Sequence, residues 1–343
     1  MIGISYHKDY DKYDLGTNHP LIGNKPTKVI RFLEEKGIID DCDIFTPKKA
    51  EVKYLLKVHT KDYVERIERL SKTGGKLSLD TPAPKGIFDY ACLATGGTIL
   101  SGVKLFDKYK ITANPLAGFH HAGISSSSGF CFFNDIAVVI EYLRERYKVK
   151  RFMIVDLDVH HGNGTQEIYY SDPSVLVISF HQNGNTLYPG TGFTEEIGQG
   201  EGIGFNVNLP LPPGTGNINY LNAFDCIVPS LSSEFKPEVI IYQSGVDTHH
   251  ADPLADLNLN YQTYYNLALR IKNISESTCN KLLILLGGGY NSTSCVKSYF
   301  NIFCGLLEKK QYIKENASPD YSGQKVVRSI DELKTKLLPY WKF

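Results

Sequence analysis

Three side chains able to bind a metal follow one apolar segment of the chain. Residues 152–155 form a continuous apolar run with a β-branched end, which predicts a strand buried on both faces of a parallel sheet. Asp156, Asp158 and His160 come next at alternate positions, so an extended chain would place them on one face. Burying such groups is costly without a partner, and a divalent cation accepts carboxylate oxygen and imidazole nitrogen together. The spacing therefore indicates a metal site, the alternative being carboxylates that cap the next helix.

Polar side chains also follow other predicted strands. Asp247 comes after residues 239–243, and Tyr290 follows three glycines after residues 282–286. Because ligands bind beyond the carboxyl ends of strands in open α/β sheets, we expect these groups to converge with the first set. Asp158, His160 and Asp247 would make a three-ligand site with one position open for water, which is typical of catalytic zinc.

Two further features favour catalysis at such a site. His120 and His121 lie in a glycine-rich loop with no helical or strand periodicity, and imidazole titrates near neutral pH, which suits acid–base chemistry. The hydroxyl of Tyr290, on backbone that glycines leave free to approach a substrate, could stabilise a developing oxyanion. For Tyr290, a loop tyrosine packed on the surface is the alternative.

Buried strands alternating with helical patterns predict an α/β fold, a parallel sheet flanked by helices with the active site at the strand carboxyl ends. No linker, repeat or low-complexity tract divides the chain, so we expect a single domain over residues 1–343. A capping box of Ser329 and Glu332 is expected to open the last helix. The predicted strands are residues 1–6, 152–155, 174–181, 205–209, 239–243 and 282–286, and the predicted helices are residues 26–36, 54–70, 88–106, 136–143, 261–274 and 333–338.

The composition argues against several functions. Lys and Arg together number 37, as do Asp and Glu, so no net charge favours nucleic acid or an anionic membrane surface. No apolar run approaches membrane-spanning length, and the first ten residues lack the order of a signal peptide. The seven cysteines are scattered without a Cys-x-x-Cys pair, as is typical of reduced thiols. We therefore expect a cytoplasmic protein.

Taken together, the motifs resemble the zinc-dependent histone deacetylase family, which includes the acetoin-utilisation and acetylpolyamine amidohydrolase proteins. The resemblance implies an arginase-like α/β fold and hydrolysis of an N-acetylated amine at the end of a narrow tunnel. Asn163, where class I members usually have aspartate, and the three glycines before Tyr290 resemble the class II branch. The motifs that carry the resemblance are His120-His121-Ala122, residues 129–135, residues 156–164, residues 188–192, Asp247 in its strand-end motif and residues 287–290.

The family resemblance also implies a role for each matching residue. Asp158, His160 and Asp247 would hold Zn²⁺, with Fe²⁺ as an alternative. His121 would be the general base and then the acid, and His120 its electrostatic partner. Asp156 would orient His120, and Tyr290 would donate a hydrogen bond to the oxyanion.

The resemblance also implies residues that line the tunnel and a second ion site. Phe130 and Tyr188 would form the tunnel walls, Gly129 would contact the acyl-lysine chain, and Asp80 would accept substrate backbone N–H groups at the rim. An inner K⁺ site would be formed by Asp156, Asp158, His160, Ser179 and Phe180.

Asn163 departs from the class I pattern with a consequence for the pH optimum. A neutral amide cannot supply the negative charge that would raise the basicity of His121.

Leu254 indicates which acetylated amine is the preferred substrate. Polyamine-selective members place glutamate at the tunnel mouth, and the matching residue here is Leu254, whose apolar side chain favours the methylene stem of lysine. We therefore expect deacetylation of lysine in proteins or peptides, and the alternatives are an acetylated polyamine or small amine, a two-metal ureohydrolase reaction, or non-catalytic binding of acyl-lysine. The oligomeric state is left open by the sequence.

Overall fold

Parallel strands alternating with helices build the chain, as the sequence predicts. The computed structural model describes residues 1–21, 23–316 and 318–343. Two compact units are interleaved along the chain. Unit 1 comprises Met1–Val149, Asn163–Ile168 and Leu283–Gly287, and unit 2 comprises Lys150–Gly162, Tyr169–Leu282 and Gly288–Phe343. The expectation that residues 1–343 act as one domain stays a prediction.

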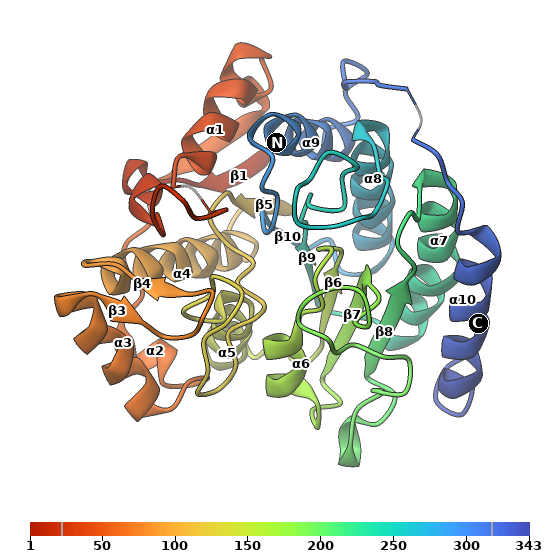
Figure 1. Cartoon of the computed structure of the whole chain (residues 1–343), viewed down its shortest axis with the longest axis horizontal. Helices are drawn as coiled ribbons and strands as arrows, with labels where there is room; N and C mark the ends of the chain where they lie inside the picture. The colour runs from red at the N-terminus through yellow and green to blue at the C-terminus, as the bar shows by residue number, and fades with distance from the viewer. Residues whose placement is uncertain (22, 317) are drawn as a thin grey trace. The chain divides into compact units, whose positions relative to one another are not determined.

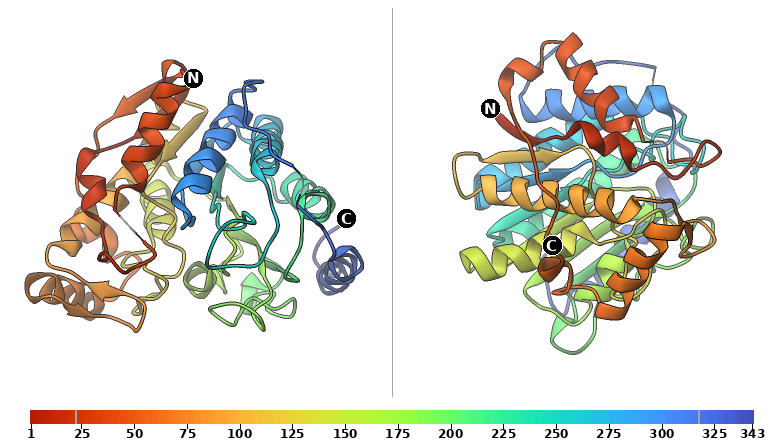
Figure 2. Two further views of the ribbon diagram at one scale, coloured as in Figure 1. Left: turned by 45° about the horizontal axis from the view of Figure 1, so that its top comes forward. Right: turned by 90° about the vertical axis from the view of Figure 1, so that its left-hand side faces the viewer.

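In unit 1, strands β2, β1, β5 and β10 lie in that order, and β1 pairs in parallel with both β2 and β5. Strands β3 and β4 form a separate antiparallel pair. Helix α4 packs against β1 and β5, and Figure 2 shows it alongside the latter strand. Most of its residues are small or apolar and buried, as the sequence indicates. The elements are β1 (Ile2–Ser5), η1 (Lys8–Lys12), α1 (Lys25–Glu35), η2 (Ile39–Asp41), β2 (Cys42–Phe45), α2 (Val52–Leu55), α3 (Lys61–Thr73), β3 (Gly75–Lys76), β4 (Pro82–Ala83), α4 (Ile87–Lys104), β5 (Ile111–Asn114), α5 (Asp135–Tyr147), α6 (Asn163–Tyr169) and β10 (Leu282–Leu285), the last two belonging to unit 1 up to Ile168 and from Leu283.

Unit 2 contains four parallel strands in the order β9-β6-β7-β8. Asp156, the last residue of β6, is in register with Ser179 of β7 and with Gln243, the last residue of β9. The loops that follow β6 and β9 therefore start at the same edge. Helix α10 packs against α7 and β8, as Figure 1 shows. The elements are β6 (Phe152–Asp156), β7 (Val175–Gln182), η3 (Gly200–Gly202), β8 (Asn206–Leu211), α7 (Asn217–Phe235), β9 (Val239–Gln243), α8 (Tyr261–Thr278), α9 (Ser292–Leu306) and α10 (Gly323–Leu337).

Two local predictions were wrong. The helix expected over residues 54–70 is interrupted between α2 and α3, because the N–H of Thr60 bonds the carbonyl of Ile124 rather than the preceding turn. Ser329 and Glu332 form no capping box, because they lie inside α10, whose N-cap is Ser322. The buried face of α10 begins earlier than the sequence pattern indicates, with Val326 and Ile330.

Further local features complete the description of the two units. Asn134 caps α5 by accepting the N–H of Ala137. All seven cysteines are free thiols. None of the described helices is long and apolar enough to cross a membrane.

Candidate active site

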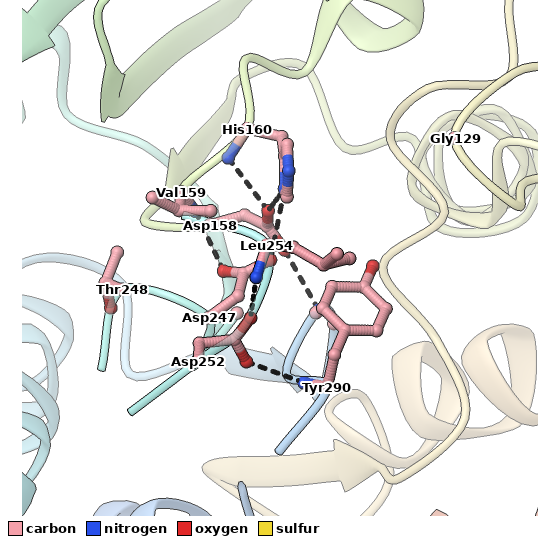
Figure 3. A network of polar contacts seen from close by, with 12 residues as sticks. Gly129, Asp158, Val159, His160, Asp247, Thr248, Asp252, Leu254 and Tyr290 are labelled. Carbon is pink, nitrogen blue, oxygen red and sulfur yellow. Dashed lines mark hydrogen bonds and ion pairs between the residues drawn. The ribbon is translucent and has the colours of Figure 1, made fainter. Parts of the chain in front are cut away.

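Unit 2 brings together the three ligands that the sequence predicts. Asp158 and His160 lie in the loop after β6, and Asp247 lies in the loop after β9. Nδ1 of His160 is 3.2 Å from Oδ1 of Asp158 and 3.2 Å from Oδ2 of Asp247. All three side chains are buried, and their ligand atoms lie within 4.8 Å of one another. Figure 3 shows the three groups directed at a common point.

The two carboxylates are held by N–H donors on the oxygens that point away from this cluster. Oδ1 of Asp247 accepts the N–H of Val159 at 2.9 Å. Oδ2 of Asp158 accepts the side-chain amide of Gln243 at 3.0 Å and the N–H of Gly288 at 2.9 Å. A Cβ on Gly288 would lie 2.1 Å from Oδ2 of Asp247, so only glycine lets the backbone approach this closely. These contacts fix the orientation of both carboxylates.

The electrostatics of the trio fit a divalent cation. Burial, together with the neighbouring charge of Asp158, raises the pKa of Asp247. Burial opposes protonation of His160, but its hydrogen bonds to Asp158 and Asp247 outweigh this and raise its pKa. Two buried carboxylates and one imidazole nitrogen directed at one point are donors that a divalent ion accepts together. The three residues therefore suit a metal with three protein ligands.

A hydrogen bond from its backbone N–H holds Tyr290 in place just before α9. Its N–H donates to Oδ2 of Asp252 at 2.7 Å, and Oδ1 of the same carboxylate accepts the N–H of Leu254 at 3.1 Å (Figure 3). Asn291, which caps α9, donates its side-chain amide to the carbonyl of Ala251 at 3.0 Å. Asp252 thus binds the backbone of both the expected oxyanion donor and the expected rim residue, and sequence reasoning missed it.

Two tyrosine rings stand near His160 in unit 2. The ring of Tyr188 lies 6.3 Å and that of Tyr290 6.5 Å from the imidazole, both edge-on. Tyr188 is exposed and Leu254 is half-buried. The expected role of Tyr188 in walling a tunnel stays a prediction.

Unit 1 holds the histidine pair, in the loop after β5. Nδ1 of His121 is 2.7 Å from Oδ1 of Asn163, the first residue of α6. The amide oxygen can only accept, so Nδ1 of His121 carries a proton and its Nε2 keeps the lone pair in the neutral ring. Nε2 of His120 lies 3.1 Å from that nitrogen. Asn163 thus selects the His121 tautomer that a general base requires.

A tight turn packs against this histidine within unit 1. Gly129 and Phe130 both have positive φ, at 53° and 68°. A Cβ on Gly129 would lie 2.0 Å from Cδ2 of His121, so the close approach requires glycine. The N–H groups of Gly129 and Phe130 donate to Oδ2 of Asp80 and to Oγ1 of Thr81. The loop between β3 and β4 therefore holds a backbone conformation that is strained at Phe130.

Asp80 forms several hydrogen bonds within unit 1 in addition to its contact with the Gly129 turn. Its Oδ1 accepts hydrogen bonds from Ser78 and Thr81, and its carbonyl is 3.0 Å from Nε2 of His19. The ring of His19 lies edge-on to Phe130 at 4.4 Å. The expected contact of Asp80 with substrate N–H groups stays a prediction, whereas its contact with the Gly129 turn is a feature that sequence reasoning missed.

The residues expected to form an inner K⁺ site lie at the end of β6, in the loop after it and on the neighbouring part of β7. Asp156 pairs in register with Ser179, and Phe180 follows on the same strand. The hydroxyl of Ser179 is 2.8 Å from Nδ1 of His181, whose Nε2 is 2.8 Å from the carbonyl of Gly192. The contact between Asp156 and His120 stays a prediction.

A second cluster in unit 2 has the residue types of a metal site but different hydrogen bonding. Nε2 of His249 and Nε2 of His250 lie 2.9 and 3.5 Å from the two carboxylate oxygens of Glu315. Nδ1 of His249 accepts the N–H of Ala251 at 3.1 Å, so the proton of the neutral ring is on Nε2, which donates it to Glu315. A metal would need the lone pair of that same nitrogen. The cluster is therefore better explained as a link between the loop after β9 and the segment before α10.

Comparisons with known proteins agree with this geometry. The histone deacetylase domain model matches residues 19–306. The chain belongs to the histone deacetylase family. It is 35% identical to a probable deacetylase of Archaeoglobus fulgidus over all of this chain and 99% of that protein. It is 32% identical to the acetoin utilization protein AcuC of Bacillus subtilis, covering 83% of this chain and 76% of that one.

A plant protein and a solved structure are also similar to this chain. Histone deacetylase 14, chloroplastic, of Arabidopsis thaliana is 33% identical over 82% of this chain and 70% of its own length. The crystal structure of the HDA15 HD domain superposes with a TM-score of 0.88 at 27% identity, covering 99% of this chain and 95% of that one. Family membership makes the chain a hydrolase that acts on amides, and the predicted fold class is confirmed.

Proposed function

We propose that this member of the histone deacetylase family removes acetyl groups from the ε-amine of lysine in proteins or peptides, releasing acetate. The observation that carries the proposal is the convergence of Asp158, His160 and Asp247 on one point. This donor set favours Zn²⁺, with Fe²⁺ as an alternative that imidazole and carboxylate also bind. Bound there, the ion would polarise the acyl carbonyl and lower the pKa of water at the site.

The chain's own residues supply the remaining chemistry. His121 keeps a lone pair on Nε2 because Asn163 accepts from its Nδ1, so we assign it to take the proton of the attacking water and to return it to the departing amine. His120 stabilises the charge that His121 then carries. Tyr290 donates its hydroxyl proton in a hydrogen bond to the acyl oxygen as that atom gains negative charge.

Replacing Tyr290 by Phe tests these roles. Loss of one oxyanion donor lowers kcat by roughly 100-fold or more, whereas bound metal per chain, measured by elemental analysis, stays unchanged because the ring is not a ligand. Turnover equal to that of the wild type would remove Tyr290 from the mechanism.

The inner K⁺ site is part of the same proposal. Oxygen ligands would come from side chains and backbone at and just after the end of β6 and from β7, and the residues are Asp156, Asp158, His160, Ser179 and Phe180. Exchanging K⁺ for a bulky organic cation should then lower the melting temperature. An unchanged melting temperature would contradict the K⁺ assignment without affecting the deacetylase assignment.

Deacetylation of polyamines is the main competing function. The apolar side chain of Leu254 does not attract a second positive charge on the substrate, which favours acetyl-lysine over an acetylated polyamine. We expect higher kcat/KM on acetyl-lysine peptides than on acetylspermidine or acetylputrescine, and Leu254→Glu should shift the ratio toward the polyamines. A wild-type preference for acetylpolyamines would contradict the lysine assignment, and an unchanged ratio in the variant would contradict the role of Leu254.

A two-metal ureohydrolase reaction and non-catalytic binding of acyl-lysine have less support. A ureohydrolase bridges two ions with shared carboxylates, but the two three-donor clusters described in unit 2 share no residue. A non-catalytic binder would not need a tyrosine hydroxyl beside the ligand cluster. Two metal ions per chain with release of urea from guanidines would favour the ureohydrolase reaction, and an absence of turnover on any acetylated amine would favour binding without catalysis.

A further inference from the structure

Helix α3 and strand β3 line a basic cleft in unit 1. The cleft has a volume of about 450 Å³. Arg66, Arg69, Leu70 and Thr73 recur at helical spacing, so they share one face of α3, beside its buried face. Figure 1 shows β3 and β4 beside this helix. The lining residues are Arg66, Arg69, Leu70, Lys72, Thr73 and Lys76.

The cationic groups of the cleft are only partly neutralised. Arg69 lies 3.8 Å from Glu65, and Lys72 lies 3.0 Å from Glu68, both being exposed pairs along the helix. Within the described residues, Arg66 and Lys76 form no ion pair. The cleft therefore presents two positive charges that an anionic ligand can engage, and the apolar side chain of Leu70 also lines it.

The cleft is connected to the histidine loop through one short hairpin. Lys76 pairs with Pro82 where β3 meets β4, and the hairpin tip contains Asp80 and Thr81. These two residues bind the Gly129 turn, which packs on the ring of His121. Lys76 and Asp80 are four residues apart, so at most about 13 Å of chain separates them. An extended substrate spans that distance with about four residues.

We propose that this basic cleft binds acidic side chains of the substrate, three to five residues from the acylated lysine. The inference rests on the proposed function, because it defines the peptide that the same enzyme prefers. Arg66 and Lys76 pair with the substrate carboxylates, and Leu70 contacts their methylene groups. These interactions are equally strong in the bound substrate and in the transition state, so they lower KM and leave kcat unchanged.

An acidic peptide fits the cleft better than a nucleic acid does. Glu65 and Glu68 lie on the same helix and pair with Arg69 and Lys72, so a long polyanion would meet negative charge beside the cleft. The chain as a whole carries no net positive charge that would attract phosphates. Two or three carboxylates on a flexible segment can engage Arg66 and Lys76 and avoid both glutamates.

The test compares two acetyl-lysine peptides that differ only in having Glu or Gln three to five residues from the acetyl-lysine, on either side. Two exposed ion pairs predict that wild-type kcat/KM is about fivefold higher on the Glu peptide, with the difference in KM. The advantage should shrink at high salt. The double variant Arg66→Gln/Lys76→Gln should turn over both peptides at the rate the wild type shows for the Gln peptide.

A matched variant controls for the loss of two positive charges. Lys53 and Lys110 are exposed lysines of unit 1 that do not line the cleft, so Lys53→Gln/Lys110→Gln should keep the preference for Glu. Equal wild-type kcat/KM on the two peptides, or an equal loss in both double variants, would overturn the proposal. Wild-type enzyme that turns over neither peptide would instead contradict the proposed function.

Binding of a peptide that contains unmodified lysine separates the two conclusions completely. A fluorescent Glu peptide should bind the wild type more tightly than the Arg66→Gln/Lys76→Gln variant by fluorescence anisotropy, whether or not the enzyme turns over its acetylated form. Identical anisotropy curves would overturn the cleft assignment. A single-stranded oligonucleotide that displaces the bound peptide at lower concentration than unlabelled Glu peptide would overturn the choice of an acidic peptide as ligand.

Discussion

Unit 2 contains two clusters of histidine and carboxylate that look alike by residue type and differ in hydrogen bonding. In the first, Nδ1 of His160 lies between two carboxylate oxygens, each an acceptor. In the second, His249 has a carboxylate of Glu315 on one nitrogen and the N–H of Ala251 on the other. In the first cluster, a cation can replace the proton on Nδ1 of His160. In the second, a cation on Nε2 of His249 would move the ring proton to Nδ1, and the hydrogen bond from the N–H of Ala251 would be lost.

The difference shows that the partner of the second imidazole nitrogen decides whether a histidine can ligate. A ligating histidine normally donates a proton from its other nitrogen to an acceptor. His249 instead has a donor there, which fixes the tautomer that cannot ligate through Nε2. The clusters differ in burial as well, because all of the first is buried whereas His250 is exposed.

The largest expected effect comes from changing a carboxylate of the first cluster. Asp247→Asn retains an oxygen for the N–H of Val159 but removes the negative charge. Metal affinity should fall on the order of 100-fold or more, because even indirect partners of ligands contribute 10- to 100-fold. Competition with a chelating dye measures the affinity. Glu315→Gln is the matched control and should retain wild-type affinity, and a loss of metal there would give the second cluster a metal-binding role.

Protonation of a buried histidine extends the comparison to unit 1. His59 donates from Nδ1 to the carbonyl of Gly123 and accepts the N–H of Asn134 at Nε2. Burial lowers its pKa from 6.5 to about 4, so the folded protein resists a proton that the unfolded chain accepts. Its stabilising contribution is complete above pH 6.5 and is lost as the pH falls toward 4, by about 2 kcal/mol at pH 5.

Urea unfolding of the wild type and of His59→Gln between pH 7 and pH 5 measures this contribution. Glutamine can donate and accept, so the variant should fold and should show a smaller loss of unfolding free energy over this range. Parallel pH curves for the two proteins would show that His59 does not resist protonation in the folded state.

A smaller effect is expected at the carboxylate that holds Tyr290. Asp252→Asn places an amide NH₂ against one of two backbone N–H groups, so Tyr290 and Leu254 are no longer both held. We expect kcat to fall roughly tenfold, the equivalent of one charged hydrogen bond, with metal content unchanged. In the background of Tyr290→Phe, the same change should have little further effect on kcat. Additive losses would mean that Asp252 acts independently of Tyr290.

The smallest expected effect is on the stability of the second cluster. Glu315→Gln keeps an acceptor oxygen for His249 but loses the charge, so the free energy of unfolding should fall by about 1 kcal/mol. Denaturant titration against the exposed control Glu201→Gln measures the difference. Equal midpoints would show that the link through Glu315 adds nothing to stability.

The clustering of Asp158, His160 and Asp247 was predictable because each follows a buried strand. Asp158, His160 and Asp247 lie within a few residues of β6 and β9, and the parallel register brings those strand ends together. The partners that hold the ligands were not predictable in the same way. Gln243 reads as the last residue of an apolar strand, and only the folded register shows that its amide reaches Asp158.

Longer-range contacts explain the remaining misses. Glu315 bonds His249 from 66 residues away, and Asp80 bonds Gly129 from 49 residues away, so no local pattern marks either pair. The break between α2 and α3 has the same origin, because the partner of Thr60 is Ile124. Periodicity identifies which face of an element is buried, whereas these positions are decided by backbone groups of distant segments.

The interleaved chain has a consequence for synthesis. Residues 1–149 of unit 1 leave the ribosome before most of unit 2, and the strand β10 that completes their order is made only after residue 281. At typical rates of translation this strand follows with a delay on the order of ten seconds. Throughout that interval the edge of β5 has no neighbour on one side, so nascent chains of this protein should depend on chaperones until β10 emerges.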